Sequence, residues 1–381
     1  MSELTVRDLG TLFDGPHATP TRIESGPYFL NIASLNGGRL ELDQSDHVSE
    51  SDFEKWTKRV EPTEGDLLFS YETRLGEAAL MPADVRACLG RRMALIRPNP
   101  TVVNPKFLLY YYLSPGFQRT IEQHTIHGAT VNRISLSTMG GWPVSIPSLD
   151  EQRAIAEVLS ALDDKITANT KLVSLIDSHM GLEYTAAVLD SASALPLSEV
   201  AEFHNRKRVP LSAREREQRP GDVPYYGASG VFGTVDTAIF DEPLVLVGED
   251  GSVINGDGTP VCQYIWGPAW VNNHAHVLTG KGISTESLFL AIKRTQVATL
   301  VTGAVQPKIN MGNLKRLTLE IPSMQRRSRL EQIVKAETAS KRATTEENRT
   351  LAATRDALLP QLMSGKLRVT DAQKVLENAG V

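Results

Sequence analysis

The chain contains two copies of one strand, turn and helix pattern. The first copy reads "GATVNRISLSTMGGWPVSIPSLDEQRAIAEVLSALDDKI", and the second reads "GAVQPKINMGNLKRLTLEIPSMQRRSRLEQIV". An offset of 175 positions superimposes the two "IPS" triplets and aligns Gly128 with Gly303, Ala129 with Ala304 and Ile134 with Ile309. Because this register aligns a strand, a turn and a helix start together, it favours an internal duplication over chance similarity. We therefore expect a fold built from two similar halves.

The composition of the chain sets limits on its class. It has 381 residues, 41% of them hydrophobic and 22% charged, which is a normal globular mixture and enough for two or three domains. Its two cysteines, Cys88 and Cys262, lack the spacing of a zinc site, so we expect no disulfide framework and no structural metal, and a reducing cytoplasm fits best. The N-terminal "MSELTVRDLGTLFDG" has no apolar core, and no apolar run of about 18 residues occurs, so neither a signal peptide nor a membrane span is expected.

Turn-forming residues and long periodic stretches divide the chain into four segments. Short apolar runs broken by Gly, Pro, Asn and Asp predict strands and turns in residues 1–147 and again in residues 193–322. Helical periodicity predicts one long helix over residues 148–192 and a second helix with a tail over residues 323–381. The predicted fold class is α+β, with two mixed α/β domains separated by long helices.

The first long helix has a well-marked start and a heptad seam. Ser148 is a suitable N-cap, and Glu151 three residues later completes a capping box. Apolar residues spaced alternately four and three, with one polar residue among them, form the seam: Ile155, Leu159, Leu162, Ile166, Asn169, Val173, Ile176 and Met180. Such strict spacing favours a coiled-coil hairpin, in which Asn169 would fix the register, over an ordinary domain helix with a wider apolar stripe.

The second long helix begins near Ser323 without a capping box, since Arg326 takes the position of Glu151. The 175-residue offset would place the charged Glu337 and Lys341 on its seam. A seam of mainly small residues is therefore predicted instead: Ile333, Ala336, Ser340, Ala343, Glu347, Thr350 and Thr354. Small residues facing large ones would let the two helices pack closely and antiparallel, with Pro360 as a kink and Gly365 as the stop.

The charge of the chain is unevenly distributed. The net charge of −5 argues mildly against a nucleic-acid partner, because phosphate binding depends on cations. However, "NRKRVPLSAREREQR" in the second half and "DVRACLGRRMALIR" in the first half are both rich in arginine. A single basic run is usually a solvated face, but one such cluster in each repeat favours contact with phosphates.

The chain lacks the sequence motifs of common enzymes. It has no GxxxxGK loop, no GxGxxG turn, no GxSxG or HExxH motif, and no Asn-Pro-Pro-aromatic tetrapeptide of an adenine methyltransferase. His274 and His276 lie two residues apart, but no cysteine or carboxylate near them in sequence would complete a metal site, so a structural or recognition role is favoured. No catalytic or metal-binding residue is predicted.

Polar and aromatic side chains on turns beside strands are the best candidates for a binding site. Hydrogen-bonding groups near glycines in the second domain are Tyr225, Tyr226, Ser229, Asp250, Asn272, Asn273 and His274. These residue types suit base edges, whereas Arg206, Lys207 and Arg208 suit phosphates, as does Lys308. The alternative for each polar residue is that it only caps a local turn.

The whole chain resembles the specificity subunits of type I restriction-modification enzymes. The resemblance rests on "RKRVPLSAREREQRPGDVPYYGASGVFGTVD", "LVLVGEDGSV", "WVNNHAHVL", "GDLLFS", "IPSLDEQRAIAEVLSALDDKI" and "LLPQLMSGKLRV". It implies two target recognition domains, each reading half of a split sequence in double-stranded DNA, and two conserved helices that form an antiparallel coiled coil. One departure is "MQRR" in the second helix where the first has "DEQR", which makes equivalent partner contacts by the two helices doubtful.

The resemblance also implies partner subunits and, by position, the DNA-binding residues of the first domain. Two modification subunits would bring S-adenosylmethionine, restriction subunits would bring ATP and Mg²⁺, and this chain itself would hold no cofactor. The DNA-binding residues expected by position in the first domain are Tyr71, Thr73, Arg74, Arg91 and Arg92. Two other classes remain open, namely a coiled-coil adapter without DNA specificity and a stand-alone methyltransferase with degenerate motifs.

The helix length predicts a spacing function. A helix of about 35 residues is about 50 Å long, which exceeds the roughly 34 Å of one turn of B-DNA. Such a helix pair could hold two recognition domains on separate grooves. Because the two domains differ in sequence, the target is expected to have two different half-sites with a fixed gap.

Overall fold

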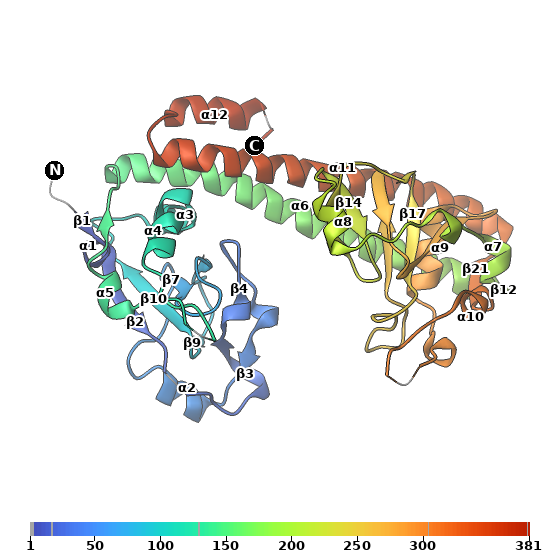
Figure 1. Ribbon diagram of the computed structural model, residues 1–381, viewed down its shortest axis with the longest axis horizontal. Coiled ribbons are helices and arrows are strands. Elements are labelled where there is room, and N and C mark those ends of the chain that lie inside the picture. Colours follow the sequence, from blue (N-terminus) through green and yellow to red (C-terminus); the bar gives the residue numbers. More distant parts are fainter. Residues whose placement is uncertain (1–3, 17, 129, 304, 379) are drawn as a thin grey trace. The chain divides into compact units, whose positions relative to one another are not determined.

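The computed structural model describes residues 4–16, 18–128, 130–303, 305–378 and 380–381 (Figure 1). The chain divides into two compact units. Unit 1 consists of Met1–Ala168 with Glu347–Val381, and unit 2 consists of Asn169–Glu346. Each unit therefore contains one mixed α/β domain and its own part of both long helices. The aligned pair Ala129 and Ala304 lies outside the described residues.

The α/β domain of unit 1 is built on a four-stranded antiparallel sheet with the order β2-β10-β7-β8. Its strands are β2 (Gly10–Asp14), β7 (Leu67–Ser70), β8 (Ala78–Leu80) and β10 (Met93–Pro98). All four residues of β7 are buried, which explains why its sequence "LLFS" has three consecutive apolar residues. Helices α3 (Pro105–Leu113) and α4 (Pro115–Gln123) bury aromatic side chains in the same core.

Smaller elements complete the domain of unit 1. In the sheet β6-β3-β9, strands β3 (Ile23–Leu30) and β9 (Ala87–Leu89) are parallel. The remaining elements are β1 (Leu4–Thr5), α1 (Val6–Leu9), η1 (Ile32–Ser34), β4 (Leu35–Asn36), β5 (Arg39–Leu40), η2 (Leu42–Gln44), β6 (Asp46–His47), α2 (Glu50–Trp56), α5 (Leu136–Met139) and β11 (Pro143–Val144).

Unit 2 repeats this topology. Its main sheet has the order β13-β20-β17-β18, formed by β13 (Ala201–Phe203), β17 (Leu244–Gly248), β18 (Cys262–Ile265) and β20 (Ala275–Gly280). In the sheet β15-β14-β19-β16, strands β14 (Val223–Tyr226) and β19 (Pro268–Val271) are parallel. The other elements are β12 (Ala192–Pro196), α7 (Leu197–Val200), η3 (Asn205–Lys207), α8 (Ala213–Glu217), β15 (Val231–Val235), β16 (Phe240–Asp241), α9 (Thr285–Lys293), η4 (Ala298–Leu300), α10 (Met311–Lys315) and β21 (Thr318–Pro322).

The two units therefore show the duplication expected from the sequence. In unit 1 the chain passes through β1, α1 and β2, and in unit 2 through β12, α7 and β13. Helices α5 and α10 begin 175 positions apart, at Leu136 and Met311. Strands β11 and β21 also begin at that offset, and each pairs with the first strand of its own unit.

The long helices are α6 (Leu149–Asp190, 42 residues) and α11 (Met324–Met363, 40 residues). The Ser148 hydroxyl accepts a hydrogen bond from the Glu151 amide (3.4 Å), as expected of an N-cap. The helices run antiparallel where they pair. In unit 2, Asp177 pairs with Lys341 (2.6 Å), whereas Asp190, farther along α6, pairs with Arg326, nearer the start of α11.

The seam of α6 lies at the heptad positions. Of the eight positions named from the sequence, Val173 is half-buried and the other seven are buried. Asn169 is 6% exposed, so the one polar residue of the seam is buried together with its apolar neighbours.

The seam of α11 differs from the prediction. Ala336, Ser340 and Ala343, which were expected to face α6, are exposed. The buried residues of α11 are Leu330, Val334, Thr338, Thr344, Leu351, Leu358 and Leu362. Four of these positions follow the 175-residue offset from α6, since Ile155, Leu159, Asn169 and Ile176 correspond to Leu330, Val334, Thr344 and Leu351.

Ion pairs explain why the prediction for α11 is wrong. The offset places Glu337 and Lys341 on the seam. Unpaired charges at a helix interface cost free energy, which is why the sequence predicted a different seam. In the structure Lys341 pairs with Asp177, and Glu337 contacts His179 Nδ1 at 2.6 Å. Partnered charges are tolerated at a part-buried helix interface, so the duplicated register is kept without an apolar residue at each position.

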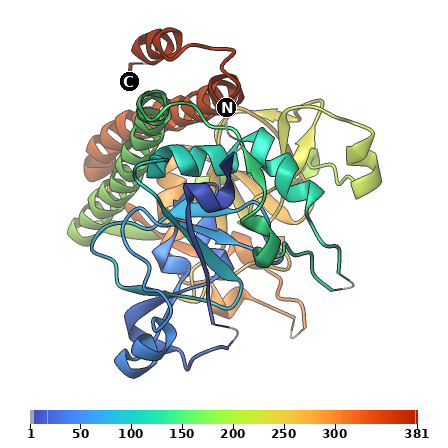
Figure 2. The same ribbon diagram turned by 90° about the vertical axis from the view of Figure 1, so that its left-hand side faces the viewer.

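A further helix, α12 (Val369–Asn378), was not predicted and takes the place of the expected tail. Helix α11 ends at Met363, and Gly365 has a φ of +68°, which favours glycine. Helix α12 then runs beside the end of α11 (Figures 1 and 2), where Ala372 and Leu376 are buried in the core of unit 1. Of the helices formed by described residues, none is long and apolar enough to cross a membrane.

Candidate nucleic-acid interface

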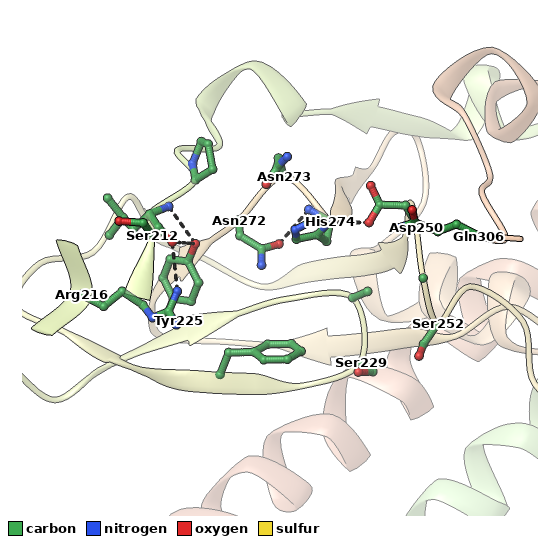
Figure 3. A pocket seen from close by; sticks show the side chains of 15 residues that line it. Ser212, Arg216, Tyr225, Ser229, Asp250, Ser252, Asn272, Asn273, His274 and Gln306 are labelled. Atoms are coloured by element: carbon green, nitrogen blue, oxygen red, sulfur yellow. Dashed lines mark hydrogen bonds and ion pairs between the residues drawn. The ribbon is translucent and has the colours of Figure 1, made fainter. Parts of the chain in front are cut away.

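A cleft of about 610 Å³ in unit 2 brings together residues from distant parts of the sequence (Figure 3). Six of the residues that line it were predicted as site residues: Tyr225, Ser229, Asp250, Asn272, Asn273 and His274. They come from β14, the turn after it, the loop after β17, and the segment between β19 and β20. Because these elements belong to two adjoining sheets, turns that are far apart in the sequence meet at one surface.

His274 is held once through its ring and once through its backbone. Its Nδ1 bonds to the carboxylate of Asp250, and its backbone amide donates to Asn272 Oδ1 at 2.8 Å (Figure 3). Asn272 is only 7% exposed, whereas the His274 side chain is 51% exposed. The contact with Asp250 orients the ring, which is still accessible to a ligand.

Tyr225 forms a wall of the cleft. It is 2% exposed, and its hydroxyl accepts from the Leu211 amide (2.9 Å) and donates to the Leu211 carbonyl (3.3 Å). The Arg216 guanidinium lies over its ring at 4.9 Å. We therefore assign Tyr225 to holding the segment around Leu211 in place, which differs from the exposed reading role predicted from the sequence. Tyr226 is half-buried and lies outside the lining of the cleft.

Of the three cations predicted to contact phosphate, Arg206 and Lys207 are exposed, whereas Arg208 is not. The Arg208 side chain is 12% exposed and pairs with Glu249 at 2.7 Å. It also donates to the carbonyls of Asn273 (3.2 Å) and Ala275 (2.7 Å). Because its Nε and Nη1 donors are used inside the protein and little of the side chain is exposed, we assign Arg208 a structural role in place of the predicted phosphate contact.

A buried polar network surrounds His276, two residues after His274. His276 is fully buried, with Nε2 donating to the Ile309 carbonyl (2.8 Å) and Nδ1 accepting from Asn205 Nδ2 (2.8 Å). Burial lowers the pKa of His276 below its ordinary value, so the ring is neutral at neutral pH. Among the residues that the structure describes, no group of three or more His, Cys, Asp or Glu is placed as metal ligands would be. Through its bond to the Ile309 carbonyl, His276 thus holds the backbone next to Lys308 in place.

Replacing His276 by phenylalanine is expected to destabilise the protein by about 1–3 kcal/mol, because Asn205 and Ile309 lose their buried partner. Urea unfolding of the full chain measures this loss. The wild type should also lose stability as pH falls below about 6.5, because the unfolded chain binds a proton that folded His276 resists. Glu249, Arg208 and Lys308 are the charged groups that act on this ring.

The matched control is His274→Ala, since this ring is half exposed and its removal should change stability little. The His276→Phe variant should show a weaker dependence of stability on pH than the wild type between about pH 5 and pH 7, because it lacks the group that titrates there. Equal stability of the wild type and the His276→Phe variant would contradict the structural role of His276.

Unit 1 contains the same loop arrangement. Three backbone hydrogen bonds connect the ends of β7 and β10 with a later loop: Tyr71 N to Arg92 O (3.2 Å), Thr73 N to Asn132 O (3.0 Å) and Ile134 N to Tyr71 O (3.0 Å). Unit 2 has the same three in the same order: Glu249 N to His274 O (2.8 Å), Gly251 N to Pro307 O (3.0 Å) and Ile309 N to Glu249 O (2.9 Å). A β-bridge joins Glu72 to Arg133 in unit 1 and Asp250 to Lys308 in unit 2.

The residues predicted by position in unit 1 have different roles in this loop. Thr73 and Arg91 are exposed, and Arg92 pairs with Glu72 at 3.0 Å. Tyr71 is buried, and desolvation raises the pKa of its phenol. Arg74 donates to the Ile32 carbonyl (2.8 Å) and pairs with Glu77, also within unit 1. Tyr71 and Arg74 therefore hold the structure of unit 1 together and are not free to contact DNA.

Two residues of this loop were missed in the sequence. Glu72 and the exposed Arg133 occupy the positions that Asp250 and Lys308 occupy in unit 2. The repeat offset of 175 residues would have identified Arg133, because it aligns Arg133 with Lys308. Glu72 has no such signal, because its alignment with Asp250 follows a different offset.

The fold and the site define a class of protein in which one α/β domain is duplicated, each copy carries the same loop with an exposed cation at its β-bridge, and two antiparallel helices accompany the domains. The family model of the type I restriction modification DNA specificity domain matches residues 19–176 and 194–348. The chain belongs to this family.

Similar proteins agree with this assignment. A putative type I restriction enzyme specificity subunit of Haemophilus influenzae is 29% identical over 145 residues, which cover 38% of this chain and 37% of that protein. The putative MjaX specificity subunit of Methanocaldococcus jannaschii is 20% identical and covers 95% of this chain and 92% of its own length. The S subunit of M. genitalium has the same fold, with a TM-score of 0.57, 19% identity and coverage of 95% and 96% of the two chains.

Proposed function

We propose that this chain is the sequence-recognition subunit of a cytoplasmic type I restriction-modification complex. Each domain binds one half-site of an asymmetric, split DNA target, and helices α6 and α11 set the gap. The observation that supports this best is that the loop defined by the three backbone hydrogen bonds occurs in both units with the same backbone pattern but with different side chains. Arg91 and Arg92 of unit 1 stand where unit 2 has Asn273 and His274. Different side chains on one scaffold should read different half-sites.

The exposed cations around the loops provide affinity, and the cleft provides specificity. Arg206, Lys207 and Lys308 in unit 2, with Arg91 and Arg133 in unit 1, are exposed and suited to phosphates. The exposed Ser229, Asn273 and His274 offer hydrogen-bonding groups of the kind that read base edges in the major groove, whereas the buried Asn272 holds the His274 backbone in place. The overall charge of −5 is compatible with this function, because the cations are local.

The outer face of α6 offers a place for a partner helix. Four leucines of unit 2 are exposed there: Leu172 (44%), Leu175 (58%), Leu182 (70%) and Leu189 (80%). Three of them are spaced by seven residues, which is the repeat of a coiled-coil seam. We propose that this leucine stripe docks a helix of a modification subunit. Such subunits would bring S-adenosylmethionine, and restriction subunits would add ATP and Mg²⁺.

A map of methylated adenines in the host genome, with and without the gene, tests the function. Deletion is expected to remove methylation at one asymmetric, gapped motif, because no other chain would supply those two half-sites. Restoring the gene should restore the same motif. If deletion leaves the map unchanged although a methyltransferase subunit co-purifies with the chain, the chain would be an adapter and the proposed function would be wrong.

A further inference from the structure

We infer that Glu72 with Arg92 in unit 1, and Asp250 with His274 in unit 2, are matched base-reading pairs, and that Arg92 binds a guanine. This inference rests on the proposed function and states how its two loops read DNA. In each of these reading pairs, the carboxylate follows one strand of the main sheet and holds a side chain that precedes the next strand in the sheet.

The backbone fixes the position of both pairs. Residues 71 and 92 are joined by a backbone hydrogen bond, as are residues 249 and 274. The bridge partners Arg133 and Lys308 flank the carboxylate residue on its other side. Since the same bonds recur in both units, the fold places a reading pair at the same point of each domain whatever its side chains are.

The guanidinium of Arg92 is held in a defined plane. Its Nε contacts Glu72 Oε2 at 3.0 Å, and its Nη1 donates to Thr73 Oγ1 at 3.3 Å. The hydrogen bond to Thr73 uses one of the five N–H donors of the group, and the ion pair with Glu72 lies at Nε. The side chain is 37% exposed, so its remaining donors can reach a ligand. The N7 and O6 atoms of guanine accept such a bidentate contact in the major groove.

The backbone at Thr73 supports this assignment. Thr73 has a φ of +71°, which is unfavourable for a β-branched residue, and the same position in unit 2 is Gly251 with a φ of +76°. Glycine would adopt this conformation without strain, so the threonine is explained by the contact of its hydroxyl with Arg92. Strained residues of this kind are concentrated at functional sites.

The pair in unit 2 has a different chemistry. Asp250 occupies Nδ1 of His274, so only Nε2 of the ring remains for a base. A single hydrogen bond discriminates less than a bidentate contact does. We therefore expect unit 1 to specify the base at this position more strictly than unit 2 does.

The test is a selection of bound sequences from randomised DNA duplexes by the complex of the full chain with its modification subunit. Arg92→Ala is expected to relax one guanine position of one half-site, with discrimination falling roughly 10- to 100-fold. Arg92→Lys should relax the same position, because lysine keeps the charge but has no planar fork. Glu72→Gln should weaken the preference at that guanine as well, because the guanidinium loses its charged partner. His274→Ala should relax one position of the other half-site.

The matched control is Arg133→Ala, a neighbouring exposed cation without a carboxylate at its side chain among the described residues. It should lower the affinity for all sequences and leave the selected motif unchanged. The slope of log affinity against log salt concentration should become shallower by about one. The inference would be overturned if Arg92→Ala behaved like Arg133→Ala, if Arg92→Lys kept the wild-type motif, or if the relaxed base were not guanine. If the wild type selected no gapped motif, the proposed function itself would be wrong. Thermal unfolding of each variant shows whether it is folded.

Discussion

Replacing Leu182 by arginine is expected to lower the affinity for the modification subunit by roughly 100-fold or more. The Leu182 side chain lies within the leucine stripe and is 70% exposed, so the folded chain gains little from it. In a helix interface, by contrast, a leucine contributes about 1.5–3 kcal/mol, and an unpaired buried charge adds a cost of its own. Co-purification of the subunit with tagged chain, followed by titration, measures the effect.

Ser174→Arg is the matched control for this prediction. Ser174 is exposed on α6 and lies about 80° around the helix axis from Leu182, outside the leucine stripe, so the same charge is added to the same helix beside the proposed docking surface. The control should bind the modification subunit normally, and both variants should unfold at the wild-type temperature. If Leu182→Arg binds as tightly as the control does, the partner does not dock on the leucine stripe.

The two long helices show what the sequence could predict about the fold. The seam of α6 was predictable because its residues are apolar and regularly spaced. The seam of α11 was not, because Lys341 and Glu337 face Asp177 and His179, and such partners are known only once the helices are placed together. The leucine stripe could have been found as a second set of heptad positions, since Leu175, Leu182 and Leu189 are spaced by seven.

The site shows a similar division. Polar residues on the turns of buried strands were predicted as a group, and the cleft brings six of them together because the strands of neighbouring sheets end near one another. The individual role of a residue depends on partners far away in the sequence. Arg208 is withdrawn from the surface by Glu249, and Tyr225 is occupied by the backbone at Leu211. Local sequence patterns carry no information about such contacts.

The gap between half-sites is expected to lengthen by about three base pairs when seven residues are inserted into both long helices. The insertions belong after Ala168 in α6 and after Glu346 in α11, where the chain passes from one unit to the other. Seven residues add about 10.5 Å of helix. They turn the helix by nearly two full turns, so each seam stays on its face. Three base pairs of B-DNA span about 10 Å, and the half-site sequences should be unchanged.

The same geometry predicts that binding to the longer target is weaker. Three base pairs turn the second half-site by more than a quarter of a turn around the DNA axis, whereas the inserted helix supplies little rotation. DNA twisting must make up the difference, which costs free energy. Selection from randomised duplexes reveals both the gap and the affinity. The control is an insertion in α6 alone, which leaves seven residues of that helix without partners and should destabilise the helix pair. A changed half-site, or an unchanged gap in a folded double insertion, would show that the helices do not set the spacing.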